Sequence, residues 1–137
     1  MFRYVRLQKG RLLPDVSDLR PFKAIVVVED LSARLWRDEA SRWLVNSGCL
    51  YMMAWGDHCE AWDESVDQAN LESFGFGAIP DDKFVVTTWH ENEALSEVFE
   101  FAKVAASHPK VELDNILVLH IGTEDKHAKY QELFDKV

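Results

Sequence analysis

The stretch AIVVVEDLSARLWRDEASRWLVNSG, residues 24–48, contains the pattern that the rest of the chain repeats. It opens with a continuous apolar run at residues 24–28, which is typical of a strand covered on both faces of a parallel sheet. A helical pattern follows over about residues 32–46, with apolar positions at Leu35, Trp36, Ala40, Trp43 and Leu44. Ser32 is the expected N-cap of this helix, and Gly48 ends it.

The same alternation of strand and helix continues to the end of the chain. Apolar runs at residues 49–54, 84–88 and 116–121 are each followed by a helical pattern. These helices are expected from about Asp57, where Asp57 and Glu60 fit a reciprocal cap, over about residues 93–107, and from Thr123 as N-cap. Strands that alternate with amphipathic helices predict a parallel sheet with right-handed crossovers.

The pattern therefore predicts an α/β fold, a three-layer α/β/α sandwich of Rossmann-like or flavodoxin-like type with a mainly parallel four-stranded sheet. We expect one domain over residues 1–137, with its core in residues 23–137. Residues 1–22 stand apart as an N-terminal edge segment. Within it, Phe2–Leu7 forms an extra edge strand or, together with Arg11–Leu13, a short hairpin.

Charge is unevenly distributed along the chain, which has 137 residues and a formal net charge of -9. Residues 1–48 hold nine Lys or Arg and six Asp or Glu, whereas residues 49–137 hold six and eighteen. Between Asp57 and Glu100 the only base is Lys83. Such a surface repels nucleic acid and anionic lipid, so we expect neither as a partner, while a basic protein remains open.

The ends and the cysteines of the chain favour a cytoplasmic protein. The N-terminus has no apolar run of signal-peptide length, and the longest apolar run, residues 49–55, is too short to span a membrane. Cys49 and Cys59 form no CxxC pair, and two such cysteines are usually reduced and structural.

Three blocks of sequence carry a family resemblance. They are SRWLVNSGCLYMMAWG at residues 41–56, IPDDKFVVTTWHE at residues 79–91 and VELD at residues 111–114. The chain resembles a family of small bacterial proteins that is known only as a domain of unknown function, and the resemblance covers nearly the whole chain. It implies a bacterial origin and one compact domain, and it carries over no activity, cofactor or functional residue.

Ligands of open α/β sheets bind outside the carboxyl ends of the strands. Here those ends are residues 29–30, 55–58, 89–92 and 120–123, and three of the five histidines fall within them. A histidine beside carboxylates can act as a general base or a metal ligand near neutral pH. The residues expected to line a binding site are Asp30, Asp57, His58, Trp89, His90, Glu91 and His120.

Local structural roles explain several of these residues equally well. His90 can cap a turn, Glu91 can complement a helix dipole, and Asp57 already has a capping partner in Glu60. Trp89 lines a pocket in one interpretation and covers the top of the core in the other. No HExxH, paired CxxC, GxGxxG, Walker A or GxSxG motif is present, so the sequence assigns no catalytic residue, metal ligand or cofactor.

The order of the strands decides which of these residues meet. If the four core strands are arranged 2-1-3-4 in chain numbering, Asp30 approaches His90, whereas the order 3-2-1-4 brings Asp30 to His120. The first hypothesis is a domain that binds a small ligand or a partner at the carboxyl ends of the strands. The alternatives are a metal-assisted hydrolase that uses the His and acid cluster, and an acidic inhibitor or immunity-like protein that binds a basic protein. Self-association through the N-terminal edge segment is left open.

Overall fold

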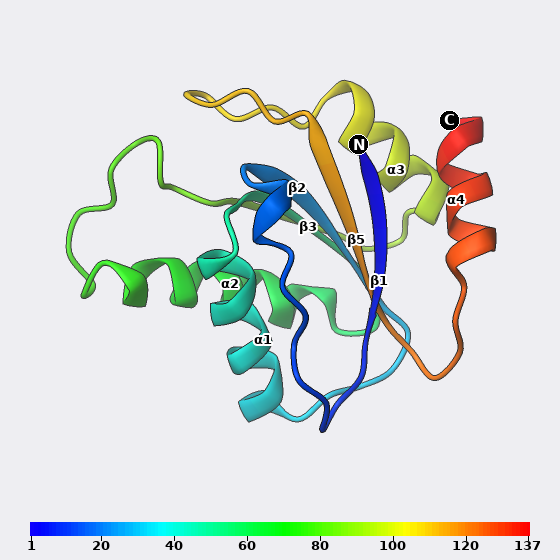
Figure 1. Ribbon diagram of the computed structural model, residues 1–137, viewed down its shortest axis with the longest axis horizontal. Coiled ribbons are helices and arrows are strands. Elements are labelled where there is room, and N and C mark those ends of the chain that lie inside the picture. The colour runs from blue at the N-terminus through cyan, green and yellow to red at the C-terminus, as the bar shows by residue number, and fades with distance from the viewer.

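The computed structural model describes residues 1–137 and contains a five-stranded sheet between two pairs of helices (Figure 1). All strand pairs are parallel, and the strands lie in the order β1-β5-β2-β3-β4. The strands are β1 (Phe2–Leu7), β2 (Phe22–Val28), β3 (Cys49–Gly56), β4 (Val86–His90) and β5 (Asn115–Ile121). The helices are α1 (Arg34–Asn46), α2 (Cys59–Ser73), α3 (Leu95–Val104) and α4 (His127–Lys136), and a 3-10 turn covers Ser17–Leu19. The α/β sandwich that the sequence predicts is confirmed.

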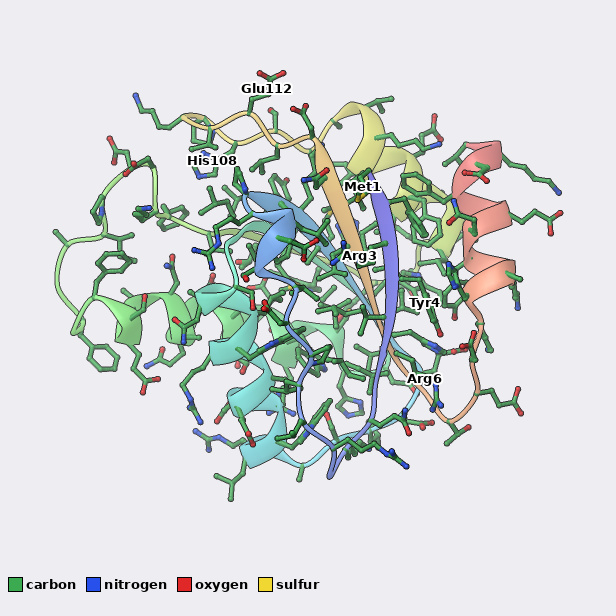
Figure 2. The ribbon with its side chains drawn as sticks, viewed as in Figure 1. Met1, Arg3, Tyr4, Arg6, His108 and Glu112 are labelled. Carbon is green, nitrogen blue, oxygen red and sulfur yellow. The ribbon has the colours of Figure 1, made fainter.

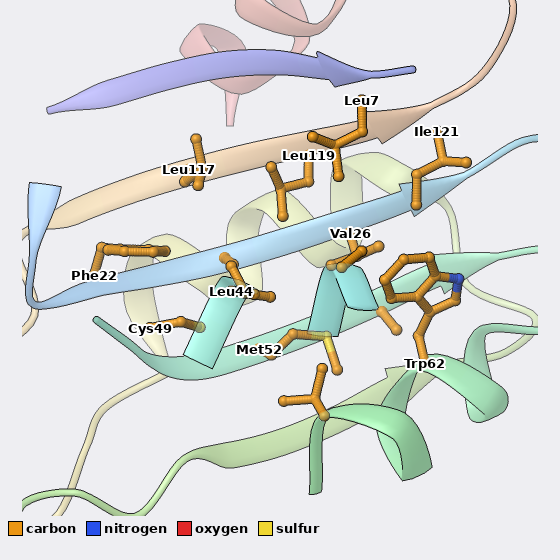
Figure 3. Close-up of a cluster of buried hydrophobic side chains, with 14 of the residues drawn as sticks. Leu7, Phe22, Val26, Leu44, Cys49, Met52, Trp62, Leu117, Leu119 and Ile121 are labelled. Carbon is orange, nitrogen blue, oxygen red and sulfur yellow. The ribbon is translucent and has the colours of Figure 1, made fainter. Parts of the chain in front are cut away.

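Apolar clusters on both faces of the sheet form the core. The cluster under α1 and α2 includes Phe22, Met52, Trp62 and Leu117, several of which are drawn in Figure 3. The cluster under α3 and α4 is separate and includes Phe99. All seven residues of β2 are buried because this central strand is covered on both faces, which explains its unbroken apolar run.

The N-terminal segment contributes an edge strand and no hairpin. β1 pairs with β5 in parallel, in a register that joins Phe2 to Ile116 and Leu7 to Ile121. Arg11–Leu13, the second strand of the hairpin alternative, has no strand structure, so the edge-strand alternative is the correct one. The chain from β1 to β2 instead crosses the face occupied by α1, where Val16 and Leu19 are buried in the core. This crossover follows from parallel pairing, because a tight turn can join only antiparallel strands.

The helices begin later than the capping patterns predict. Ala33 precedes α1 in the N-cap position in place of Ser32, and His58, in the left-handed conformation, precedes α2 in place of Asp57. α4 begins at His127, whose N–H donates to Asp125 Oδ1 at 2.8 Å, so Thr123 does not cap it. The third helix is also shorter than expected, Leu95–Val104.

A close approach between two strand ends explains the late start of α2. Gly56 has a φ of 103°, and a Cβ there would overlap the carbonyl oxygen of Val28. The turn brings the Asp57 N–H to that same oxygen, at 2.9 Å. Asp57 is therefore used in holding the β2 and β3 ends together, and the helix starts two residues later.

The strand order places the reversal of the sheet between β2 and β5. β3 and β4 continue outward from β2 on one side, while β5 and β1 lie on the other. This is the order 3-2-1-4 for the four core strands, one of the two alternatives that the sequence allowed. No helix combines the length and the apolar character needed to cross a membrane.

Candidate functional site

A buried polar network closes the sheet at its reversal point, between the carboxyl ends of β2 and β5. His120, the next-to-last residue of β5, is fully buried, and its Nε2 contacts Glu29 Oε1 just beyond β2. On the other side, the Tyr4 hydroxyl of β1 lies 2.6 Å from His120 Nδ1. Figure 2 shows Tyr4 and Arg6 on the side of β1 that faces α4, which is the helix that completes the network.

Donors and acceptors in the network agree with one arrangement of protons. The Lys126 backbone N–H donates to the Tyr4 oxygen at 3.0 Å, which leaves the Tyr4 hydroxyl proton for His120 Nδ1. His120 then carries its own proton on Nε2 and donates it to the Glu29 carboxylate. The chain Lys126, Tyr4, His120, Glu29 is a continuous hydrogen-bonded path from α4 to β2.

Glu29 remains ionised because several donors surround it. Lys126 Nζ donates to Oε2 at 2.6 Å, and the Tyr130 hydroxyl donates to Oε1 at 3.0 Å. Burial alone would raise the pKa of Glu29, but the hydrogen bonds from Lys126, His120 and Tyr130 outweigh it and hold that pKa below its ordinary value. Burial, reinforced by the nearby Glu29 carboxylate, raises the pKa of Tyr130, so its hydroxyl stays protonated and donates.

The backbone fits tightly around this network. A Cβ on Gly122 would lie 2.5 Å from His120 Nε2 and 3.3 Å from Glu29 Oε1, so only glycine fits at this position. The backbone N–H groups of Glu29 and Asp30 both donate to the Ile121 carbonyl, at 2.9 and 3.1 Å. The reversal point, where open α/β sheets often bind ligands, is thus filled by the protein's own side chains.

A first hollow lies at the carboxyl ends of β3 and β4. It has a volume of about 300 Å³ and is lined by Trp55, Gly56, His90, Glu91, Asn92 and Glu93. His90 is buried, and its Nδ1 pairs with Glu93 at 2.9 Å while its Nε2 meets Thr88 Oγ1 at 2.9 Å. The expected partner Glu91 is exposed and makes no side-chain hydrogen bond to His90. Both imidazole nitrogens are thus occupied within the chain.

A second hollow lies at the carboxyl ends of β2 and β3, toward α1 and α2. Its volume is about 220 Å³, and its lining residues are Val28, Leu31, Ser32, Arg37, Asp57, His58 and Trp62. Arg37 also borders the groove between α1 and α2, and its Nε is buried without any hydrogen-bond partner. A buried donor on a charged group that lacks a partner costs free energy, and a bound water or ion is one of the arrangements that removes this cost.

The residues expected from the sequence to form one site are divided by the structure. Asp57 and His58 border the hollow toward α1 and α2, whereas His90 and Glu91 border the other hollow, where the ring of Phe101 from α3 lies 5.2 Å from that of His90. The sequence pairing of Asp57 and His58 with His90 and Glu91 therefore lacks a common cavity. No group of three or more His, Cys, Asp or Glu side chains is arranged to hold a metal ion.

The remaining three expected residues have different surroundings. His120 meets Glu29 where the sequence expected Asp30, because side chains alternate along the strand direction and Glu29 shares the α4 side of β2 with Val27. Asp30 contributes only its backbone N–H. Trp89 is 47% exposed at the edge of the sheet and neither lines the hollow beside it nor covers the core.

The sequence did not identify the residues that complete the network around His120, nor the arginine that borders the second hollow. Tyr4, Lys126 and Tyr130 come from the first strand and the last helix, so no local spacing connects them to His120. Gly122, two positions after His120, was the one local signal in the sequence, because a Cβ at that position would overlap the His120 ring. Arg37 was hidden among the polar positions of α1, and its unpaired nitrogen is visible only in the folded chain.

Comparison with known proteins supplies a family and no activity. A family model described as Domain of unknown function (DUF7684) matches residues 2–137. The chain belongs to this family. Searches of the curated proteins and of the solved structures gave no match.

Proposed function

We propose that this member of the DUF7684 family binds a small anionic molecule in the hollow at the carboxyl ends of β2 and β3. The observation that carries the proposal is Arg37, which borders both that hollow and the groove between α1 and α2 and whose Nε is buried and unpaired. A guanidinium presents its donors in a planar fork that matches carboxylate and phosphate oxygens. An anion that draws the Arg37 side chain toward the hollow would satisfy the nitrogen that the chain itself leaves without a partner.

The starts of two helices add further donors for the proposed ligand. α1 begins at Arg34 and α2 at Cys59, and neither has a side chain that caps its first N–H groups. Ser32, two residues before α1, and His58, the residue before α2, both border the hollow. Free N–H groups and the helix dipole favour an anion at such a place.

Local charge supports the proposal although the whole chain is acidic. Lys9 reaches the hollow's border, because its Nζ donates to the Leu31 carbonyl. Asp57 is the one acid in the lining, and it is exposed, so solvent screens its repulsion. A volume of about 220 Å³ is smaller than the usual drug-sized pocket. We therefore expect a ligand with few heavy atoms, such as inorganic phosphate or a short carboxylate.

Thermal unfolding tests the proposal with inorganic phosphate and succinate as probes, against sodium chloride at matched ionic strength. A ligand at about a hundred times its dissociation constant stabilises a protein by ~2.7 kcal/mol, which raises the melting temperature by several degrees. We expect such a rise with at least one probe and its loss in Arg37→Met. Methionine keeps the apolar length of the side chain and removes the donors.

Arg42→Met is the matched control on the same helix. Arg42 lies 3.9 Å from Glu72 in the groove between α1 and α2 and does not border the hollow. The control should keep the full shift. An equal shift in both variants, or no shift above that of sodium chloride in the parent chain, would contradict the proposal.

A further inference from the structure

The sheet has an unprotected edge at β4. This strand pairs only with β3, and Figure 3 shows it as the outermost green strand below β3. In a strand with one neighbour, half of the backbone N–H and C=O groups point away from the sheet. Proteins usually protect such an edge with Lys, Pro or a bulge, yet Val86–His90 contains none of these and pairs in continuous register.

The opposite edge, β1, shows what a protected edge looks like in the same sheet. Arg3 holds Asp18 of the following crossover through two hydrogen bonds, at 2.9 and 2.6 Å. Arg6 donates to the Gly122 and Thr123 carbonyls at 3.4 Å. Two anchored cations along a six-residue strand oppose the approach of another strand. β4 has no charge within it.

The surroundings of β4 are acidic on the face that α2 covers. Thr87 Oγ1 donates to Asp67 at 2.7 Å, so this carboxylate lies directly beside the strand. Asp63, one turn earlier on α2, is only 6% exposed, and its Oδ2 has no hydrogen-bond partner. The single base between Asp57 and Glu100 is Lys83, which precedes the strand. Uncompensated negative charge therefore accompanies the open backbone.

Two aromatic side chains flank the open edge. Phe84, just before β4, is 48% exposed, and Trp89, within it, is 47% exposed. Trp89 lies two residues after Thr87 and so projects on the same face as the Asp67 contact. A cationic side chain on an added strand could contact the Trp89 ring and pair with Asp67.

We infer that β4 is a docking edge for an extended segment of a partner protein with Lys or Arg at alternate positions. The backbone of the segment would add a sixth strand, and its side chains on the α2 face would meet Asp67 and Trp89. Charge complementarity selects this occupant. Pairing of β4 with β4 of a second copy is disfavoured because it would bring two acidic faces together.

The inference can be tested with a fluorescently labelled heptapeptide in which lysine alternates with valine. Fluorescence anisotropy measures its binding to the full chain. One control peptide has glutamate in place of lysine, and a second keeps lysine but carries N-methyl groups that block strand pairing. We expect binding of the lysine peptide alone, weakening as salt is raised. Asp67→Asn should weaken it about tenfold, which is the loss of one charged pair.

Glu72→Gln is the matched control, since Glu72 lies on α2 and its carboxylate faces Arg42 rather than β4. It should bind the peptide as the parent chain does. Equal binding of the N-methylated peptide would show charge attraction without strand pairing and would overturn the inference. The absence of binding at millimolar peptide would also overturn it. A dimer in sedimentation that Thr88→Lys dissociates would overturn it as well, because a second copy of the chain would then occupy the edge.

Discussion

Glu29 and Asp63 are two carboxyl groups with restricted access to water, and the fold treats them in opposite ways. Glu29 is 30% exposed and accepts hydrogen bonds from His120, Lys126 and Tyr130. Asp63 is 6% exposed and has one oxygen without a partner. The pKa of Glu29 lies below its ordinary value, whereas burial and the nearby charge of Asp67 raise the pKa of Asp63 to about 6.

The difference shows how depth and partners together decide whether a charge with little access to water is tolerated. Donors from β5 and α4 converge on Glu29, so its charge contributes to holding β2, β5 and α4 together. Asp63 receives mainly further negative charge, so ionisation there opposes folding. One acid therefore strengthens the closed reversal point, and the other weakens the region beside the open edge strand.

Removing His120, the central residue of the network around Glu29, should cause the largest loss of stability. We expect His120→Ala to lower the free energy of unfolding by about 4 kcal/mol, because it opens a cavity and takes a donor from the partly buried Glu29 carboxylate. Urea unfolding followed by tryptophan fluorescence measures the change. His127→Ala is the control, since His127 is exposed and only stacks on Tyr4. Equal losses in the two variants would mean that the network contributes nothing beyond general packing.

Neutralising Glu29 tests its charge separately from its shape. We expect Glu29→Gln to lower the free energy of unfolding by about 2 kcal/mol at pH 7, since the carboxylate accepts from three side chains and one of them, Lys126, is charged. The stability that a lowered pKa provides is present above the unfolded value and is lost as pH falls through the folded value. The gap between variant and parent should therefore close as the solution is acidified. Asp30→Asn, one residue along and without a side-chain partner, should change stability little at either pH.

The sequence was sufficient for the architecture because that depends on local periodicity. Apolar runs and helical stripes recur along the chain, and β2 is buried over its whole length, as its unbroken run predicts. Helix starts were less predictable. Gly56 and its contact with the Val28 carbonyl shift the start of α2, and this contact joins segments that are distant in sequence.

The candidate site was harder to predict because its members come from opposite ends of the chain. Tyr4 and His120 are 116 positions apart and meet only when β1 and β5 become neighbours. The sequence correctly placed histidines at the carboxyl ends of strands. It could not show which of their side chains lie on the same face of the sheet. Alternation along β2 would have favoured Glu29 over Asp30 as the partner of His120, once the strand order was known.

Neutralising Asp63 should change the free energy of unfolding least, and it should stabilise the chain where the two earlier variants destabilise it. In the folded chain the pKa of Asp63 is about 6, above its ordinary value of 3.8, so the folded state holds a proton that the unfolded state releases first. Stability from this group is therefore greatest below about pH 4 and falls as pH rises to about 6. Asp63→Asn should abolish that fall and stabilise the chain by about 1 kcal/mol at pH 7, less than the ~3 kcal/mol that the full shift represents, because the asparagine leaves a buried amide in place of the carboxyl group.

Glu64→Gln, on the neighbouring position of α2, should leave the pH profile of the parent chain unchanged. The profile of Asp63→Asn should then separate the two carboxyl groups, because the remaining rise in stability, which is complete near pH 4.5, belongs to groups like Glu29, whose pKa lies below its ordinary value of 4.5. If Asp63→Asn were instead destabilising at pH 7, the carboxylate must find a partner in solution that satisfies its buried oxygen. Asp63 would then resemble Glu29, and the contrast between the two sides of the sheet would disappear.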